Sequence, residues 1–144
     1  MYRIKNSLEV FLVHPGGPFW KDKNKGAWSI SKGEIEDGEN FLEAAIRELN
    51  EETVIKPECK FIPLGSVKQK SGKIVHAWAF EGEWNGFLMK QNMIEIEFPY
   101  GSGKKIKIPE IDKADFFNLE KAKEKIIPAQ VEFIKRLEKI LREK

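Results

Sequence analysis

The sequence has little cysteine and no long apolar stretch. Cys59 is the single cysteine among 144 residues, which excludes an internal disulfide, and we interpret it as a buried or half-buried, inert thiol. This suits a reducing compartment, so we expect a cytoplasmic protein. No run approaches the roughly 18 consecutive apolar residues of a membrane span. The first apolar run, Leu8 to Val13, contains Glu9 and lacks a small-residue cleavage site, so we expect no signal peptide and no membrane partner.

The chain also lacks an excess of charge of either sign. Lys and Arg number 25 against 23 Asp and Glu, and the formal net charge is +2. Such a chain has no overall field to attract nucleic acid or anionic lipid, so any phosphate binding must be local. With 41% hydrophobic and 33% charged residues, the composition is that of a globular protein, and we predict one domain over residues 1–144.

Apolar periodicity predicts strands before a central helix. We expect a strand at residues 8–13, ended by the turn cluster of residues 14–18, and a short strand at residues 27–30. A helix is then expected from near Asn40 to near Thr53, because apolar residues recur at spacings of three and four. These residues are Leu42, Ala45, Ile46 and Leu49.

Two hairpins and two helices are predicted after it. The first hairpin joins residues 61–68 to 73–80, and the second, a surface insertion over residues 93–108, places Glu97 opposite Lys105 and Glu95 opposite Lys107. A strand at 114–117, a short helix at about 119–125 and a packing helix at about 129–142 complete the chain. The packing helix carries an apolar stripe of Val131, Ile134, Leu137, Ile140 and Leu141.

Three carboxylates stand together on the predicted central helix. Glu48, Glu51 and Glu52 fall within an arc of about 100°, clear of the apolar face. Like charges at these spacings destabilise a helix, especially near its C-terminus, so they need a counter-charge. Arg47 is one candidate and a divalent cation is another, because oxygen-only clusters suit Mg²⁺, Mn²⁺ or Ca²⁺ rather than Zn²⁺. Taken alone, the cluster is also compatible with solvated glutamates that have lysine partners.

The residues around these glutamates favour a metal site over solvated glutamates. The spacing of residues 33–55 resembles the Nudix box, G-x5-E-x7-R-E-U-x-E-E-x-G-U. The residues at its fixed positions are Gly33, Glu39, Arg47-Glu48-Leu49, Glu51-Glu52 and, at the end, Val54-Ile55. One fixed position differs, because Val54 stands where the family has its last glycine. A β-branched residue tolerates positive φ poorly, so the exit turn must differ while the charged positions are kept.

The resemblance implies a fold and a chemistry. Nudix domains are mixed α/β (α+β) proteins, an α-β-α sandwich around a mixed β-sheet, and they hydrolyse a phosphoanhydride bond of a nucleoside diphosphate linked to another moiety, with water as nucleophile and Mg²⁺ or Mn²⁺ as cofactor. Carried over, Glu48, Glu51 and Glu52 are similar to the metal ligands, with the backbone carbonyl of Lys32 completing the site. Arg47 and Glu39 resemble the orienting pair. Arg47 and the three glutamates are thus the expected catalytic residues.

Substrate residues are predicted from weaker signals. Trp28 to Gly33 resembles the W-x-x-P-K-G of dinucleoside polyphosphate hydrolases, with Ser31 in place of proline, and Lys32 there is a candidate for a distal phosphate. Trp20, set among lysines, and Tyr100 are candidates for stacking on a base. The general base is left open among Glu81, Glu83, Glu95 and Glu97, with the first two preferred. His14 and His76 lack zinc-site spacing and are interpreted as structural or incidental.

These features predict that the protein is a metal-dependent pyrophosphohydrolase. Its expected substrate is a small nucleotide, either a dinucleoside polyphosphate or a nucleoside triphosphate. Two alternatives stay open. Removal of pyrophosphate from the 5′ end of RNA needs a basic track, for which Lys104, Lys105 and Lys107 are candidates, although the net charge disfavours nucleic acid. A Nudix domain that senses nucleotides or binds RNA without turnover is disfavoured because the box carboxylates are kept.

Overall fold

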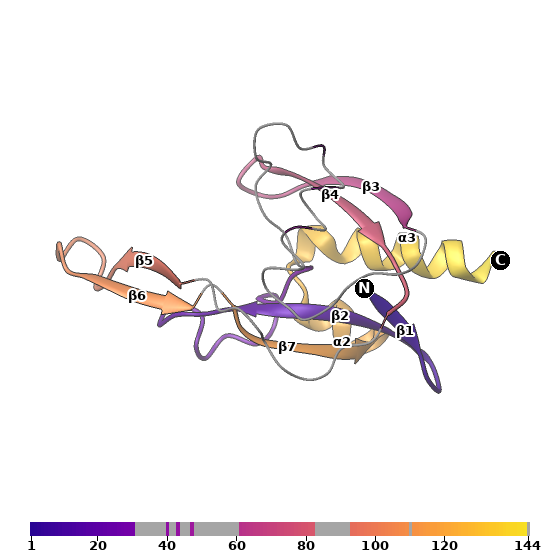
Figure 1. Cartoon of the computed structure of the whole chain (residues 1–144), viewed down its shortest axis with the longest axis horizontal. Coiled ribbons are helices and arrows are strands. Elements are labelled where there is room, and N and C mark those ends of the chain that lie inside the picture. Colours follow the sequence, from indigo (N-terminus) through magenta and orange to yellow (C-terminus); the bar gives the residue numbers. More distant parts are fainter. Residues whose placement is uncertain are drawn as a thin grey trace.

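The computed structural model of the chain describes residues 1–30, 40, 43, 47, 61–82, 93–109 and 111–143 (Figure 1). It has mixed α+β content, as the sequence predicts. Within these residues, the strands pair in three antiparallel ladders, and the parallel contacts are isolated bridges at Tyr2–Glu81 and Trp28–Ile126. No helix of the described part is long and apolar enough to cross a membrane.

A three-stranded sheet lies at the centre of the molecule. Strand β2 (Leu8–Pro15) is flanked by β1 (Tyr2–Ile4) and β7 (Ile111–Asn118). Every residue of β2 from Val10 to His14 is buried, so the strand is covered on both faces.

The side chains on the two faces of β2 belong to two separate apolar clusters. Successive side chains of a strand point to opposite faces. Val10 and Leu12 therefore join the larger cluster with Trp28, whereas Phe11 and Val13 join the smaller one. The smaller cluster also contains Phe80, Ile111 and Phe116.

Helix α3 (Val131–Arg142) packs on the larger cluster, between the central sheet and the hairpin of β3 (Ile62–Lys68) and β4 (Ile74–Ala79) (Figure 1). Its buried residues come from the predicted apolar stripe and its neighbour Phe133. Arg136 on the same helix donates from Nη1 to the carbonyl oxygens of Leu64 and Ser66, at 2.8 and 3.0 Å. Leu64 lies at the irregularity in the β3–β4 register and Ser66 lies two positions further along β3, so the arginine supports this irregular stretch.

The short helix predicted before α3 is confirmed. Helix α2 (Leu119–Lys125) has the predicted limits, and the Asn118 side chain caps it by accepting from the Lys121 N–H. A 3₁₀ turn, η1 (Pro128–Gln130), then leads into α3.

The second hairpin has the predicted register. Strand β5 (Met93–Glu97) pairs with β6 (Lys105–Pro109), with Glu97 opposite Lys105 and Glu95 opposite Lys107. The ion pair found there runs diagonally, from Lys105 Nζ to Glu95 Oε1 at 3.8 Å. Figure 1 shows the β5–β6 hairpin projecting from the rest of the fold.

Two local predictions were wrong, and one strand was not predicted. Strand β2 continues past Val13 to Pro15, because a shift in register between His14 and Pro15 accommodates a residue without an N–H. Residues 27–30 form isolated bridges instead of a strand, one of them between Ser29 and Val13. Strand β1 was missed, since three residues with Arg3 at their centre give no apolar pattern.

Candidate functional site

The described part of the Nudix-like box includes the start of its helix. Asn40 Oδ1 accepts from the Glu43 N–H at 2.8 Å, and Glu43 Oε2 accepts from the Asn40 N–H at 3.3 Å. This reciprocal pair is a capping box, and it lies where the sequence predicts the helix to begin. Arg47, one turn after Glu43, is helical and half-buried.

Most of the predicted metal and catalytic residues lie outside the described residues. These are Lys32, Glu39, Glu48, Glu51 and Glu52, and the general-base candidate Glu83. The part of the chain that the structure describes holds no cluster of three His, Cys, Asp or Glu side chains that could bind a metal. The metal site therefore stays a prediction from the sequence.

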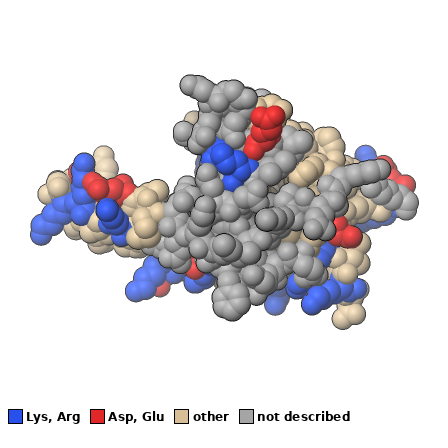
Figure 2. Space-filling model, viewed as in Figure 1, with Lys and Arg blue, Asp and Glu red and all other residues tan. Residues whose placement is uncertain are grey.

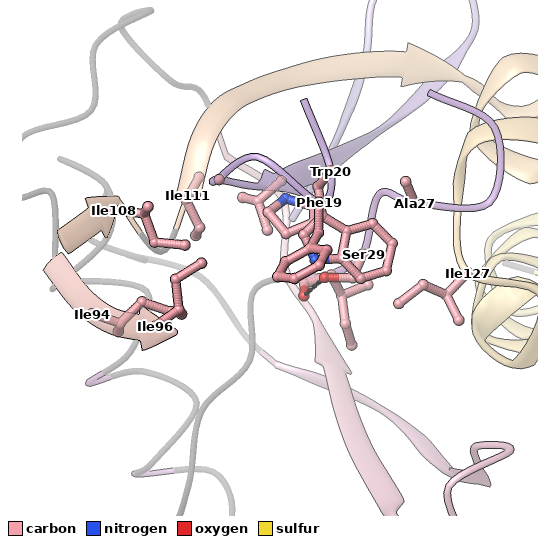
Figure 3. Close-up of a pocket in the computed structure, with 13 residues that line it drawn as sticks. Phe19, Trp20, Ala27, Ser29, Ile94, Ile96, Ile108, Ile111 and Ile127 are labelled. Atoms are coloured by element: carbon pink, nitrogen blue, oxygen red, sulfur yellow. Dashed lines mark hydrogen bonds between the residues drawn. The ribbon is translucent and has the colours of Figure 1, made fainter. Parts of the chain in front are cut away.

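An apolar pocket of about 330 Å³ lies where the end of β2, the 16–30 segment and the β5–β6 hairpin meet. Its volume is in the range of small-molecule sites. Figure 3 shows Phe19 and Trp20 in the middle, with Ile94, Ile96 and Ile108 on one side of them and Ala27 and Ile127 on the other. The remaining lining residues are Val13, Pro15, Gly16, Ser29, Ile30 and Ile111.

Two aromatic rings form the wall that the 16–30 segment gives to this pocket. Trp20 is 39% exposed and Phe19 is 49% exposed, unusual values for large apolar side chains beside a core. The Lys23 ammonium lies over the Trp20 ring, 5.2 Å from its centroid. The wall thus combines open aromatic surface with a positive charge, as the sequence predicts for Trp20 among its lysines.

Polar contacts, in part buried, hold this segment on the fold. His14, 1% exposed, lies 2.7 Å through Nδ1 from Asp112 Oδ1 and 2.6 Å through Nε2 from the Lys23 carbonyl oxygen. Trp28 Nε1 and Lys125 Nζ both donate to Asn24 Oδ1 at 2.9 Å. The structure thus gives His14 the structural place expected from the sequence, but no sequence signal pointed to its partners.

The opposite wall comes from the hairpin and is held by apolar contacts. The Phe98 ring meets Phe19 edge-on, with centroids 5.7 Å apart. The Ile108 side chain lies directly against Gly17, leaving no room for a Cβ there.

The predicted stacking residue Tyr100 lies apart from the pocket. It stands in the β5–β6 turn, 91% exposed, and is not among the lining residues. Figure 2 shows charges of both signs on the projecting hairpin. Since Lys105 and Lys107 stand opposite glutamates, this hairpin does not form the continuous basic track that an RNA substrate needs.

The general-base candidates among the described residues occupy different places. Glu81 lies just after β4 and bridges Tyr2. Glu95 pairs with Lys105, and Glu97 accepts a hydrogen bond from the Gly101 N–H on the hairpin. The contacts of Glu95 and Glu97 are local to the hairpin. Glu81 therefore stays the preferred candidate for the general base among these three residues.

The comparisons with known proteins identify the family. The family model for the NUDIX domain matches residues 2–137, which is nearly the whole chain. The chain belongs to the Nudix family. This Nudix protein is accordingly a hydrolase acting on phosphoanhydride bonds.

Solved structures agree on the fold of this Nudix chain at low identity. An Ap4A hydrolase of C. elegans, solved as a binary complex, is 19% identical with a TM-score of 0.71, covering 99% of this chain and 95% of that one. The NUDIX domain of Shewanella oneidensis NrtR, complexed with ADP ribose, is 15% identical with a TM-score of 0.67, covering 97% and 82%. A MutT protein from Methanosarcina mazei Go1 is 19% identical with a TM-score of 0.58, covering 98% and 91%. No curated protein matches the chain.

Proposed function

We propose that this Nudix protein hydrolyses a phosphoanhydride bond of a small nucleotide, a dinucleoside polyphosphate or a nucleoside triphosphate, and holds the base in the apolar pocket. The observation that carries the proposal is the open aromatic wall of Phe19 and Trp20 in a cavity of about 330 Å³. A planar base stacks on such rings, and each base–aromatic stack contributes about 1 to 3 kcal/mol. The Lys23 ammonium beside Trp20 suits the phosphates that follow the base.

The dinucleoside polyphosphate class has two further supports. One is the resemblance of Trp28 to Gly33 to the motif of such hydrolases, which also makes Lys32 a ligand for a distal phosphate. The other is the structural likeness to an Ap4A hydrolase. Tyr100, exposed at the hairpin turn, is the residue we assign to the second moiety of such a substrate.

The metal is Mg²⁺ or Mn²⁺ in this proposal. The donor set of Glu48, Glu51 and Glu52, completed by the Lys32 carbonyl, consists of oxygen atoms alone and fits these ions. When bound, the ion neutralises charge on the leaving phosphate and lowers the pKa of water.

The chain's own residues supply the rest of the chemistry. Arg47 and Glu39 orient the carboxylates of the metal site, and Glu81 or Glu83 acts as the general base that takes a proton from the attacking water. Lys32 and Lys23 attract the phosphates, and the pocket excludes water from the base.

The test is product release from a panel of nucleotides with Mg²⁺, Mn²⁺ or chelator. The panel contains dinucleoside polyphosphates, nucleoside triphosphates, nucleotide sugars and 5′-triphosphorylated RNA. We expect metal-dependent hydrolysis of the first or second class. Glu52→Gln should lower it about a hundredfold or more while the melting curve stays unchanged, since it removes one ligand charge and little volume.

The outcomes separate the alternatives. Hydrolysis confined to RNA would favour the RNA 5′ pyrophosphohydrolase, and nucleotide binding with no turnover would favour a sensing domain. Normal turnover by both Glu51→Gln and Glu52→Gln in Mg²⁺ would contradict the assigned metal site.

A further inference from the structure

Apolar side chains from two elements line the pocket together. Phe19 and Trp20 come from the 16–30 segment. Ile94, Ile96 and Ile108 come from the β5–β6 hairpin and lie on one side of these rings (Figure 3). Ile94 pairs with Ile108 in the ladder, and Ile96 is two residues from Ile94, so the three isoleucines share one face of the hairpin. A flat ring bound between such walls makes its contacts through its two faces.

Two polar side-chain groups belong to the described lining residues, the Ser29 hydroxyl and the Trp20 indole N–H. Ser29 donates its proton to the Ile30 carbonyl oxygen at 2.9 Å, so that proton is not available to a base. The indole N–H lies in the plane of the Trp20 ring. It therefore points past the edge of a base that is stacked on that ring.

Several backbone groups of the lining are already paired within the fold. Val13 and Ser29 exchange two N–H to carbonyl hydrogen bonds, at 2.8 and 2.9 Å, and the Ile30 N–H donates to Gln130 Oε1 at 3.0 Å. In the part of the chain that the structure describes, no buried side-chain polar atom lacks a hydrogen-bond partner. A pocket that recognises the edge of a base needs unpaired donors and acceptors, and these groups do not supply them.

Recognition of the edge of a base and recognition of its faces give different selectivity. A site built to hydrogen-bond a polar group of its substrate rejects an analogue without that group by about 10⁴-fold to 10⁵-fold, because its own buried groups are then left unpaired. Stacking on aromatic rings tolerates many bases, since every base has a π face. Apolar walls with paired polar groups therefore accept bases that differ only in their edges.

We propose that this pocket recognises the faces and the ring size of a base and not its edge, so that the protein accepts nucleotides of different bases and takes its selectivity from the phosphate chain. Trp20 and Ile96, one from each wall, are the specificity-determining residues of this recognition. The inference rests on the proposed function, because it takes the pocket as the place where the base binds.

The experiment compares substrates that differ only in the base. Dinucleoside tetraphosphates and nucleoside triphosphates are prepared with adenine, guanine, uracil and unsubstituted purine, which lacks exocyclic groups, and kcat/KM is measured in Mg²⁺. The three purines should agree within about tenfold, and uracil, with one ring, should lie at most about tenfold below them. A preference of about a hundredfold or more among the three purines would show recognition of the base edge and would overturn the proposal.

Ile96→Ala tests the hairpin side of the pocket. It removes apolar contact with the face of any base, so kcat/KM should fall by a common factor of about threefold to tenfold for all four bases. Ile106→Ala is the matched control and should leave kcat/KM unchanged. Ile106 lies opposite Ile96 in the ladder, is 36% exposed and is not among the lining residues. A fall for one base alone in Ile96→Ala, or equal falls in the two variants, would contradict the role of Ile96.

Binding separates this inference from the proposed function. The same nucleotides are titrated in Mg²⁺ and in chelator and followed by tryptophan fluorescence. Similar affinities for all four bases with no turnover would contradict the proposed hydrolysis and support recognition of the base faces. Turnover with a preference of about a hundredfold among the purines would support hydrolysis and overturn the inference. Binding of none of these nucleotides under either condition would overturn both.

Discussion

The two walls of the pocket are held by different kinds of interaction. The 16–30 segment is fixed by part-buried polar contacts, from His14 to Asp112 and Lys23 and from Asn24 to Trp28. The β5–β6 hairpin is two-stranded and meets the segment through side-chain packing. A two-stranded hairpin is marginally stable alone. The comparison suggests that the segment sets the shape of the pocket, whereas the hairpin can adjust to what it holds.

The largest stability effect should come from the polar wall. His14→Leu removes both ring contacts and leaves the Asp112 carboxylate and the Lys23 carbonyl without that partner. We expect a loss of about 2 to 4 kcal/mol in the free energy of unfolding, measured by urea denaturation. A loss within about 0.5 kcal/mol would mean that the polar contacts do not hold this wall.

The junction between the walls should show a smaller loss. Gly17 has φ of +96°, and a Cβ there would overlap the Ile108 side chain. Gly17→Ala should cost about 1 to 3 kcal/mol through backbone strain and overpacking, and it should raise KM because the hairpin is pushed outward. Gly72→Ala is a matched control, since Gly72 has φ of +89° with open space around it. Equal KM values in the two variants would show that the Ile108 contact does not shape the pocket.

The apolar wall alone should give the smallest effect. Phe98→Ala removes the edge-on contact with Phe19 at the protruding hairpin, which contributes about 0.5 to 1.5 kcal/mol. In steady-state kinetics we expect KM to rise about twofold to tenfold, the factor that corresponds to this energy. We expect almost no change in the melting temperature. Lys105→Ala, which breaks an exposed ion pair on the same hairpin, should alter neither. A marked drop in melting temperature for Phe98→Ala would contradict the idea that the hairpin is a peripheral wall.

The sequence predicted the elements whose patterns are local. The alternation of Glu95 and Glu97 with Lys105 and Lys107 was enough to give the hairpin register, and the limits of α2 were also predicted. The start of the box helix at Asn40 was likewise predicted.

The pocket and its anchor could not be predicted in this way. His14 and Asp112 are 98 residues apart, and neither lies in a pattern that indicates a partner. The lining residues come from the end of β2, the 16–30 segment and the hairpin, so their proximity is a property of the fold. Trp20 was selected because it is an aromatic residue among lysines, whereas Tyr100 was selected as an aromatic residue alone, and Tyr100 lies outside the pocket.

The most direct test of the account is a titration of the protein with its best nucleotide in chelator, followed by tryptophan fluorescence. Binding should change the fluorescence of the wild type. Trp20→Phe should bind with similar affinity and lose most of this change, whereas Trp20→Ala should bind about tenfold more weakly, as expected for the loss of one base stack. Wild-type affinity in Trp20→Ala, with the full fluorescence change in Trp20→Phe, would contradict the claim that this pocket holds the substrate.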